Sequence, residues 1–334
     1  MKIVVDSHIP HIQGKIEPRA EVLYLEPGDI TRAAVKDADA LIVRTRTRCD
    51  AALLDGSRVR FIGSATIGTD HIDLDYCASQ GITVHNAPGC NAPAVAQWVF
   101  CAIHAWMRTR NIPSPAGLTL GVVGVGHIGS IVARWGRALG FNVLLNDPPK
   151  ENGDGSCDDI FEPLETLQRR CDIITFHTPI TREGPWPTWH LCDERFLDGL
   201  VQCRLILDAA RGAIADNAAL LQWQGDVALD CWENEPDISR ELLEKCIVAT
   251  PHIAGYSAEG KQRGTAMMLE ALNDFYHWDI PVPTIAAPAT GAHDVTLEGI
   301  AASYDILADT TALKTTPTAF ESLRNHYLHR PEYQ

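Results

Sequence analysis

The sequence predicts an α/β protein built on two doubly wound parallel sheets. Short runs rich in valine, isoleucine and leucine recur along most of the chain, and helix-patterned stretches separate them. Strands that alternate with helices in this way form parallel sheets covered by helices on both faces. The chain has 334 residues, 46% of them hydrophobic and 21% charged, so it is long enough for about two such domains.

Residues 1–92 are predicted to form the first α/β domain. Five short strands are expected in it: Lys2–Val5, Val22–Leu25, Ala40–Val43, Phe61–Ser64 and Thr83–His85. A turn that contains proline and glycine, Pro88–Pro93, interrupts the pattern. The strongly apolar stretch Ala94–Arg108 then predicts a core helix that links this domain to the next.

A glycine-rich turn marks the start of the second domain. It follows an apolar strand at Leu118–Val123 and precedes a helix at Ile128–Leu139. Its glycines are Gly124, Gly126 and Gly129. In a strand–turn–helix unit, glycines at this spacing permit a tight turn, a close approach to a pyrophosphate and close helix packing. The backbone of His127 and Ile128 would then meet the phosphates at the helix N-terminus.

A carboxylate follows at the position where the ribose of a dinucleotide is bound. The second strand of this domain, Phe141–Asn146, ends at Asp147. A carboxylate there accepts hydrogen bonds from the ribose hydroxyls and repels the 2′-phosphate of NADP. Together with the glycine turn, Asp147 predicts a Rossmann domain that binds NAD.

Polar loops follow four further strands of this domain. The expected strands are Ile173–Phe176, Leu205–Leu207, Val227–Leu229 and Ile247–Ala249. The loops after them are His177–Pro179, Asp208–Gly212, Asp230–Pro236 and Thr250–Gly255. Because ligands of open parallel sheets bind beyond the carboxyl ends of the strands, we expect these loops to meet the reactive end of the cofactor.

The chain is then expected to return to the first domain along a long amphipathic helix, Ala258–His277. The tail after it opens with a proline- and alanine-rich linker, Pro281–Ala292, and carries a helix-patterned piece at Thr318–Leu328. The expected parts are a flavodoxin-like substrate domain of residues 1–92 plus 254–280, an inserted Rossmann domain of residues 93–253, and a linker with a C-terminal segment of residues 281–334.

Charge and cysteine content exclude several kinds of partner. The formal net charge of −15 argues against nucleic acid or an anionic membrane as the main partner. The chain has no apolar run long enough to span a membrane, and Met1–Asp6 predicts a strand rather than a signal peptide. The ten cysteines form no CxxC pair and many stand in apolar runs. They predict reduced thiols in a cytoplasmic protein, and no metal site.

Several motifs occur in a fixed order along the chain. They are the glycine turn with Asp147, His177–Pro179, Ala210–Gly212, Asp230–Pro236 and Pro251–His252. This order resembles that of the D-isomer-specific 2-hydroxyacid dehydrogenases, over about residues 1–330. Narrower motifs resemble a subgroup that oxidises 4-phospho-D-erythronate in the vitamin B6 pathway: Thr66–Asp73, Ala87–Asn91, Asp147–Pro149, Phe176–Pro179, and His252–Tyr256 with Glu259–Gly264.

The resemblance implies three catalytic residues for hydride transfer. His252 would be the base that takes the alcohol proton, since an imidazole titrates near neutral pH. Glu235 would pair with it and fix its tautomer. Arg211 would clamp the substrate carboxylate with its planar fork and polarise the C2 oxygen. From the residues alone, a structural histidine, a solvated loop acid and a surface ion pair remain the alternatives.

The resemblance also implies contacts to cofactor and substrate. Those to NAD are Thr178, Ala209, Asp230 at the nicotinamide amide, and Gly255. Those to the substrate are Thr45, Thr66 and Tyr256. The basic residues Arg44, Arg46 and Arg48 alternate, so on a strand they would share one face, and Lys261 and Arg263 begin the returning helix. Any of these cations would suit a substrate phosphate, and a solvated basic edge is the open alternative.

Three functions remain open at this point. The first is an NAD-dependent dehydrogenase of 4-phospho-D-erythronate, acting as a homodimer with a shortened C-terminal dimerisation region. The second is a sister dehydrogenase of glycerate, phosphoglycerate or a related D-2-hydroxy acid. The third is an NAD-sensing corepressor that binds partners and barely catalyses. Gln97 stands where many relatives of this family carry a glutamate, with a consequence that the residues alone do not reveal.

Overall fold

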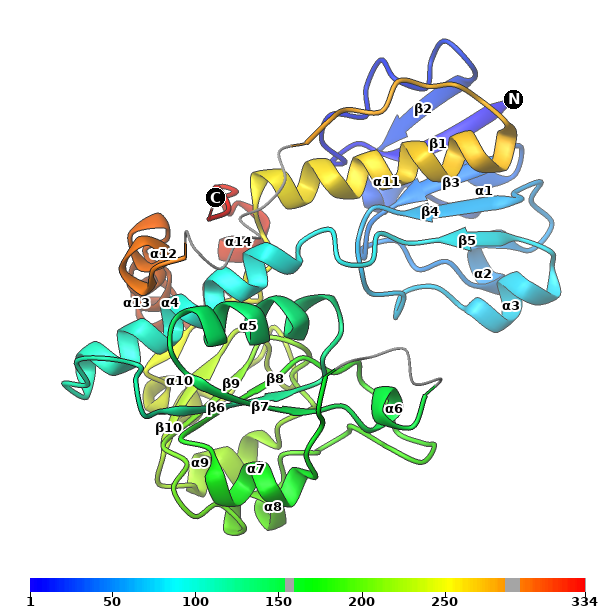
Figure 1. Cartoon of the computed structure of the whole chain (residues 1–334). Coiled ribbons are helices and arrows are strands. Elements are labelled where there is room, and N and C mark those ends of the chain that lie inside the picture. The colour runs from blue at the N-terminus through cyan, green and yellow to red at the C-terminus, as the bar shows by residue number, and fades with distance from the viewer. Residues whose placement is uncertain (154–158, 286–294, 334) are drawn as a thin grey trace. The chain divides into compact units, whose positions relative to one another are not determined.

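The computed structural model describes residues 1–153, 159–285 and 295–333, which fold into two compact units (Figure 1). Unit 1 is Met1–Asn91 with Ser257–Ala286, and unit 2 is Ala92–Tyr256 with Ala287–Gln334. Most of unit 2 is therefore inserted between the two segments of unit 1. Each unit has its own parallel sheet, which confirms the predicted α/β fold class.

Unit 1 is a five-stranded parallel sheet of order β2-β1-β3-β4-β5, the flavodoxin-like order. The strands are β1 Lys2–Asp6, β2 Glu21–Leu25, β3 Ala40–Val43, β4 Phe61–Ser64 and β5 Thr83–His85. The helices are η1 Pro27–Asp29, α1 Arg32–Val35, α2 Ala51–Leu54, α3 Leu74–Ser79 and α11 Ala258–Tyr276. The predicted strands are confirmed to within a residue at each end.

Helices cover both faces of the sheet in unit 1. On one face, Met268 and Leu272 of α11 pack with Ile3, Val5 and other buried residues of the strands (Figure 1). On the other face, the short helices α1 to α3 pack over a second apolar cluster. The long helix α11 thus contributes to the core on one face of the sheet of unit 1, although it follows the first segment of that unit by more than 160 positions of sequence.

Unit 2 is a six-stranded parallel sheet of order β11-β10-β9-β8-β6-β7. The strands are β6 Thr119–Val123, β7 Asn142–Asn146, β8 Ile173–Phe176, β9 Leu205–Asp208, β10 Asp226–Leu229 and β11 Val248–Ala249. A single parallel bridge between Leu145 of β7 and Phe161 stands where the Rossmann order has its outermost strand. The sheet therefore follows the dinucleotide-binding order with one strand reduced to a bridge.

One helix of unit 2 precedes its sheet and six lie between its strands. They are α4 Ala92–Thr109, and then α5 His127–Ala138, α6 Pro148–Glu151, α7 Leu164–Arg170, α8 Glu194–Asp198, α9 Asn217–Gln222 and α10 Arg240–Lys245. The linking helix α4 is a core element, as predicted, because its side chains Trp98, Phe100 and Trp106 are fully buried. Together with α5 it covers one face of the sheet, and α7 to α10 supply the apolar cluster on the other face.

The C-terminal segment is more ordered than the sequence predicts. It contains α12 Leu297–Ser303, α13 Ile306–Thr315, η2 Pro317–Ala319 and α14 Phe320–Asn325. The expected helix at Thr318–Leu328 is thus shorter, and two helices before it were not foreseen. The helices α12 and α13 pack against α4, so this segment belongs to unit 2 rather than standing apart. Residues 286–292 of the expected linker lie outside the described residues.

The boundaries of the two units differ slightly from the expected ones. Residues Ala254–Tyr256 belong to unit 2 and not to the substrate domain. The reason is local, since the Ala254 N–H is hydrogen bonded to the carboxylate of Asp230 at the end of β10. The chain leaves unit 2 only at Ser257, whose side chain caps the N-terminus of α11.

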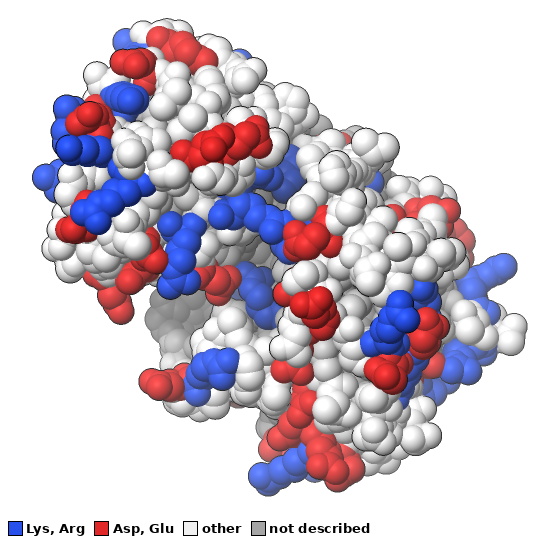
Figure 2. Space-filling model, turned by 180° about the vertical axis from the view of Figure 1, so that it is seen from behind, with Lys and Arg blue, Asp and Glu red and all other residues white. Residues whose placement is uncertain are grey.

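The described residues contain no helix that is both long and apolar enough to cross a lipid bilayer. On the face drawn in Figure 2, lysine and arginine side chains alternate with aspartate and glutamate, and neither sign forms a continuous field.

Candidate functional site

The glycine turn of unit 2 uses its three glycines in different ways. Gly124 has a φ of +86°, and a Cβ there would lie 2.9 Å from backbone atoms of His177 and Thr178. A Cβ on Gly129 would lie 1.9 Å from the carbonyl oxygen of Gly124. A Cβ on Gly126 would meet no atom within 4 Å. Gly124 and Gly129 are required by the fold, and Gly126 keeps open a space that a ligand can enter.

The N-terminus of α5 opens into the same space. The helix begins at His127 with Gly126 as its N-cap, and no side chain caps it. The first N–H groups of a helix have no partner within the helix, and they carry its positive dipole end. An uncapped N-terminus beside an open glycine turn suits a pyrophosphate.

Asp147 is tied to the glycine turn. Its Oδ2 accepts the Val125 N–H at 2.7 Å, and its Oδ1 accepts the Lys150 N–H at 3.1 Å. Each carboxylate oxygen keeps a further lone pair for a ribose hydroxyl. Asp147 borders a cavity of about 590 Å³, whose other walls include Gly124, Gly126, Leu164, Thr178, Pro179 and Trp186. A few polar groups on mainly apolar walls, at this volume, suit a nucleotide.

Two buried polar atoms on the cavity wall have no hydrogen-bond partner among the described residues. They are Nδ1 of His177 and Oγ1 of Thr178. The other ring nitrogen of His177 lies 3.1 Å from Oγ1 of Thr175, and burial lowers the pKa of His177 to about 3, so the ring is neutral. Orphaned polar atoms at a cavity wall are satisfied when a ligand enters. The residues present therefore fit a dinucleotide.

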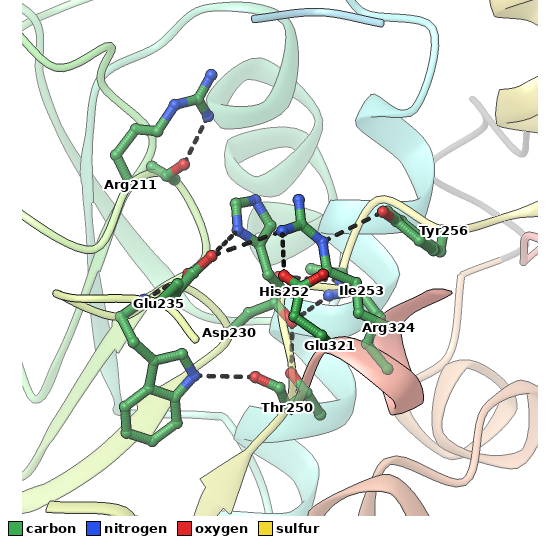
Figure 3. Close-up of polar contacts among 12 residues, drawn as sticks. Arg211, Asp230, Glu235, Thr250, His252, Ile253, Tyr256, Glu321 and Arg324 are labelled. Atoms are coloured by element: carbon green, nitrogen blue, oxygen red, sulfur yellow. Dashed lines mark hydrogen bonds and ion pairs between the residues drawn. The ribbon is translucent and has the colours of Figure 1, made fainter. Parts of the chain in front are cut away.

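His252 and Glu235 form a hydrogen-bonded pair at the ends of β11 and β10 (Figure 3). Nδ1 of His252 lies 2.8 Å from Oε2 of Glu235, which leaves Nε2 free to face a substrate. The other carboxylate oxygen of Glu235 accepts the Trp232 N–H at 2.9 Å. His252 holds a left-handed φ of 57°, a conformation that costs energy for a non-glycine residue and concentrates at functional sites.

Glu235 is ionised in this arrangement. Burial alone would raise the pKa of Glu235, but the hydrogen bond and charge of His252, the Trp232 N–H and the nearby charge of Arg324 outweigh burial. The net effect is a lowered pKa for this carboxyl group. An ionised partner on Nδ1 fixes the ring tautomer and favours the imidazolium form when His252 accepts a proton.

Asp230 fixes the loop that carries His252. Its carboxylate accepts hydrogen bonds from the Thr250 hydroxyl at 2.5 Å, the Ile253 N–H at 2.8 Å and the Ala254 N–H at 2.9 Å. The side chain is fully buried, and burial raises its pKa despite these bonds. The backbone of His252 is held as well, by its N–H donating to the Asp230 carbonyl. The expected contact of Asp230 with nicotinamide remains a prediction beside this structural role.

Arg211 follows β9 in the neighbouring loop, and its Nη1 donates to the carbonyl of Ala210 at 2.7 Å. The next residue fixes the distance between this loop and that of Glu235, because a Cβ on Gly212 would lie 2.0 Å from the backbone of Trp232. Because β9 and β11 are parallel strands of one sheet, Arg211 and His252 both follow strands at its carboxyl edge. The arrangement offers an imidazole, its carboxylate partner and a guanidinium at the same edge of the sheet as the dinucleotide cavity.

Comparison with known proteins identifies the family. Residues 5–283 match the D-isomer specific 2-hydroxyacid dehydrogenase family, catalytic domain. The chain belongs to this family. It is 45% identical to an erythronate-4-phosphate dehydrogenase of Bacteroides fragilis, over 99% of this chain and 97% of that protein. It is 38% identical to the Escherichia coli protein of the same name, over 100% of this chain and 92% of that protein.

Solved structures agree on the fold. A D-lactate dehydrogenase from Aquifex aeolicus, complexed with NAD and lactic acid, matches with a TM-score of 0.68 and 25% identity, over 83% of this chain and 96% of that one. A 3-phosphoglycerate dehydrogenase of Entamoeba histolytica with bound NAD⁺ matches with a TM-score of 0.69, 23% identity, and 86% and 99% coverage. At that lower identity the likeness concerns the fold alone.

Unit 1 of this dehydrogenase carries the other expected substrate residues, and one expectation about them is wrong. Arg44, Arg46 and Arg48 do not share a strand face, because β3 ends at Val43 and a turn follows. A run of arginines cannot continue a strand that is buried on both faces. Nε of Arg44 lies 3.0 Å from Oδ2 of the buried Asp6, while Arg48 pairs with Asp50.

Of the remaining expected substrate residues of the dehydrogenase, Tyr256 lies in unit 2, and the others lie at loops and a helix start in unit 1. Thr45 stands in the turn after β3, and Oγ1 of Thr66 lies 2.8 Å from Oγ of Ser64 at the end of β4. Lys261 lies in the first turn of α11. Their proposed contacts with substrate remain predictions.

Three residues of the dehydrogenase that matter to the site escaped the sequence analysis. Asp208 ends β9 fully buried, and Arg324 of α14 reaches Glu235. Arg330 is buried and donates to the backbone that follows His252. Asp208 gave a weak signal as a charged residue next to an apolar run, whereas nothing local marks Arg324 or Arg330.

One group of possible metal ligands exists among the described residues. Cys231, Glu235 and His252 each offer a ligand atom, and these atoms lie within 4.8 Å of one another. Two of the three atoms already form the hydrogen bond of the catalytic pair. Burial, together with the charges of Asp230 and Glu235, raises the pKa of the Cys231 thiol well above its usual value, so the thiol is neutral.

Proposed function

We propose that this dehydrogenase oxidises 4-phospho-D-erythronate at C2, with NAD as the hydride acceptor. The observation that carries the proposal is the 2.8 Å pair of His252 and Glu235, held beyond the ends of β11 and β10 in the same parallel sheet whose β6, β7 and β8 ends border the dinucleotide cavity. Relatives that bear the name erythronate-4-phosphate dehydrogenase match along nearly the whole chain, which supports this substrate over its sisters.

Oxidation of a secondary alcohol removes two hydrogens from it, one as a proton and one as a hydride. Nε2 of His252 accepts the proton of the C2 hydroxyl, and the C2–H bond breaks as the C2=O bond forms. The bound cofactor would supply the two-electron acceptor for the hydride that leaves C2. Glu235 stabilises the resulting imidazolium, and His252 returns its proton to water before the next turnover.

Each unit offers its own candidate contacts to the substrate or the cofactor. We assign the carboxylate of the substrate to the fork of Arg211, which suits bidentate binding. For NAD we assign the pyrophosphate to the turn at Gly124–Gly129 and the ribose to Asp147. Residues 1–91 with α11 would act as the substrate domain, with Thr45, Thr66, Arg46 and Lys261 as its candidate contacts.

The test is a specificity panel with purified protein. NADH formation should be fastest with 4-phospho-D-erythronate and NAD, and much slower with D-erythronate, D-glycerate, 3-phospho-D-glycerate or NADP. Faster turnover of a panel member without the four-carbon phosphorylated chain would assign a sister reaction. Binding of NAD without turnover of any member would favour the corepressor-like alternative.

We also propose that the protein acts in the cytoplasm as a homodimer. The nine cysteines among the described residues are free thiols, and most are buried, which suits a reducing compartment. Dimerisation is suggested by the subgroup that the sequence resembles, and light scattering of the purified protein will measure it. A monomeric mass at the concentration used for the activity assay would contradict this part of the proposal.

A further inference from the structure

Arg324 places a second guanidinium beside the catalytic pair. It stands in α14, which is anchored by Phe320 in the apolar core of unit 2 and by Leu323 packed on the same cluster. Nη1 of Arg324 lies 3.8 Å from Oε2 of Glu235, the same oxygen that lies 2.8 Å from Nδ1 of His252. The fold of unit 2 therefore brings a cation from the C-terminal segment next to the base.

The guanidinium of Arg324 uses little of its hydrogen-bonding capacity. Nε donates to the hydroxyl of Tyr256 at 3.3 Å. Nη1 stays 3.8 Å from Glu235 and 4.0 Å from Glu321, which is beyond hydrogen-bond range. Of the five N–H donors of an arginine, the described residues thus engage one by a hydrogen bond. The two carboxylates supply charge, but they leave the forked end of the side chain for another acceptor.

The side chain of Arg324 is placed for a ligand rather than for bulk solvent. It is 18% exposed, which is enough for an incoming group to reach it. Because the side chain is mostly removed from water, an oxyanion that hydrogen bonds to it gains more than it would at the surface. A planar fork matches the two oxygens of a carboxylate or a phosphate.

The positions of the two arginines decide which oxyanion this is. In Figure 3 the guanidinium groups of Arg211 and Arg324 lie on opposite sides of the imidazole of His252. A substrate whose C2 hydroxyl contacts His252 extends an anion in each direction, the C1 carboxylate on one side and the phosphate at C4 on the other. Since Arg211 is assigned to the carboxylate, the second guanidinium faces the phosphorylated end.

We infer that Arg324, with the Tyr256 hydroxyl, forms an anion subsite for the terminal phosphate of the substrate. The inference rests on the proposed function and names the part of unit 2 that would distinguish a phosphorylated from an unphosphorylated 2-hydroxy acid. A phosphate there also competes with Glu235 for Arg324. Oε2 of Glu235 is then left to His252, so phosphate binding would strengthen the support of the imidazolium.

The experiment compares Arg324→Gln with the wild type on 4-phospho-D-erythronate and on D-erythronate. We expect kcat/KM for the phosphorylated substrate to fall about ten- to hundredfold, the loss typical of a charge-assisted contact, and mainly through KM. For D-erythronate the change should stay within about threefold. Arg324→Lys should fall between, because a lysine keeps the charge and loses the fork. Arg195→Gln is the matched control, since Arg195 is an exposed arginine of the short helix α8.

Equal losses on both substrates would overturn the inference and leave Arg324 as a positioning residue that acts through Glu235. Inorganic phosphate gives a second measurement if Arg324→Gln fails to fold. It should inhibit the wild type in competition with the phosphorylated substrate, and Arg324→Lys should weaken that inhibition about tenfold. Unchanged inhibition by phosphate would also overturn the inference. If the wild type does not turn over 4-phospho-D-erythronate, the proposed function is wrong instead. The effect of Arg324→Lys on phosphate inhibition of the true reaction then tests the subsite by itself.

Discussion

Nε of Arg330 donates a hydrogen bond to Oε1 of Gln97 at 3.1 Å, in the interior of unit 2. The amide nitrogen of Gln97 donates to the Ser303 hydroxyl and to the carbonyl of Pro331. An amide serves here because it accepts from the arginine and donates to two oxygens, which a carboxylate does not do. Gln97 therefore ties α4 to the C-terminal segment, which is the consequence that its residue type alone did not reveal.

Replacing Arg330 with methionine should loosen the catalytic loop. Its guanidinium donates to the carbonyls of Ile253 and Tyr256, at 3.0 and 3.3 Å, and to that of Ala254. Loss of these bonds leaves buried acceptors unsatisfied, so we expect a loss of about 3 kcal/mol in the free energy of unfolding. kcat should fall as well, because His252 precedes these carbonyls directly. Urea denaturation and steady-state kinetics measure the two effects, and Arg195→Met should change neither. A stable and fully active variant would show that the loop holds without this anchor.

Replacing Glu235 with glutamine should shift the pH profile of oxidation. The ionised carboxylate favours the imidazolium form of His252, and an amide does not, so the neutral base persists to lower pH. The acidic limb of kcat/KM should therefore move to lower pH, while the maximal rate falls because the imidazolium of the reaction is less stabilised. Glu233→Gln is the control, since Oε1 of Glu233 contacts His190 at 2.8 Å instead. An equal shift of the acidic limb in both variants would show that Glu235 is not the specific partner of His252.

Two glycines of the turn should give opposite outcomes when replaced by alanine. At Gly126 the added Cβ meets no atom within 4 Å, so the variant should melt near the wild-type temperature while NAD affinity falls about tenfold or more. At Gly129 the Cβ would lie 1.9 Å from the Gly124 carbonyl oxygen, so the turn itself must distort and stability should fall. Calorimetry and NAD titration separate these outcomes. Unchanged NAD affinity in Gly126→Ala would mean that the pyrophosphate lies elsewhere.

Asp208 should make the protein less stable as pH rises. Burial raises its pKa to about 8, against the hydrogen bonds from the N–H groups of Ala210 and Arg211. Between about pH 4 and pH 8 the unfolded chain loses this proton while the folded chain keeps it, so unfolding is favoured by up to about 1.4 kcal/mol per pH unit. Asp208→Asn removes this dependence and keeps an acceptor for Ala210. The difference in melting temperature, variant minus wild type, should increase from pH 5 to pH 8. A difference that stays constant over this range would contradict the raised pKa of Asp208.

Arg46 and Lys261 are the residues to replace in a test of phosphate binding in unit 1. Removal of either should lower kcat/KM for 4-phospho-D-erythronate about ten- to hundredfold and spare D-erythronate. Arg44→Ala is a poorer probe, because it leaves the buried carboxylate of Asp6 without its cation and costs stability whatever the substrate. Equal losses on both substrates for Arg46→Ala and Lys261→Ala would assign these residues to the fold.

The sheets were predictable because their strands are short apolar runs ended by turn or charged residues. β3, for example, is completely buried, and its apolar sequence stops where Arg44 begins. The alternating arginines after β3 have the pattern of a half-exposed strand. A strand with both faces buried cannot accommodate arginines, so β3 does not continue into them. The glycine turn was equally visible, since its spacing reflects a backbone geometry that few other residues tolerate.

The C-terminal helices and the residues around the catalytic pair were not predictable in the same way. Helix α13 has no clear apolar stripe, although Asp305 caps its N-terminus. Arg324 and Arg330 act on partners that stand 68 to 236 positions earlier in the chain. Such pairs depend on tertiary packing, which leaves no periodic trace in a single sequence.

The order in which the chain is made has a consequence for activity. During synthesis the residues from the glycine turn to His252 emerge well before Arg324 and Arg330, which support them from the C-terminal segment. α11, which completes the core of unit 1, also emerges after the whole inserted stretch of unit 2. A nascent chain that already carries the glycine turn, Arg211, Glu235 and His252 is thus still without the anchors of its catalytic loop. We therefore expect activity only once the final helices have been translated, and a ribosome stalled before them should hold an inactive protein.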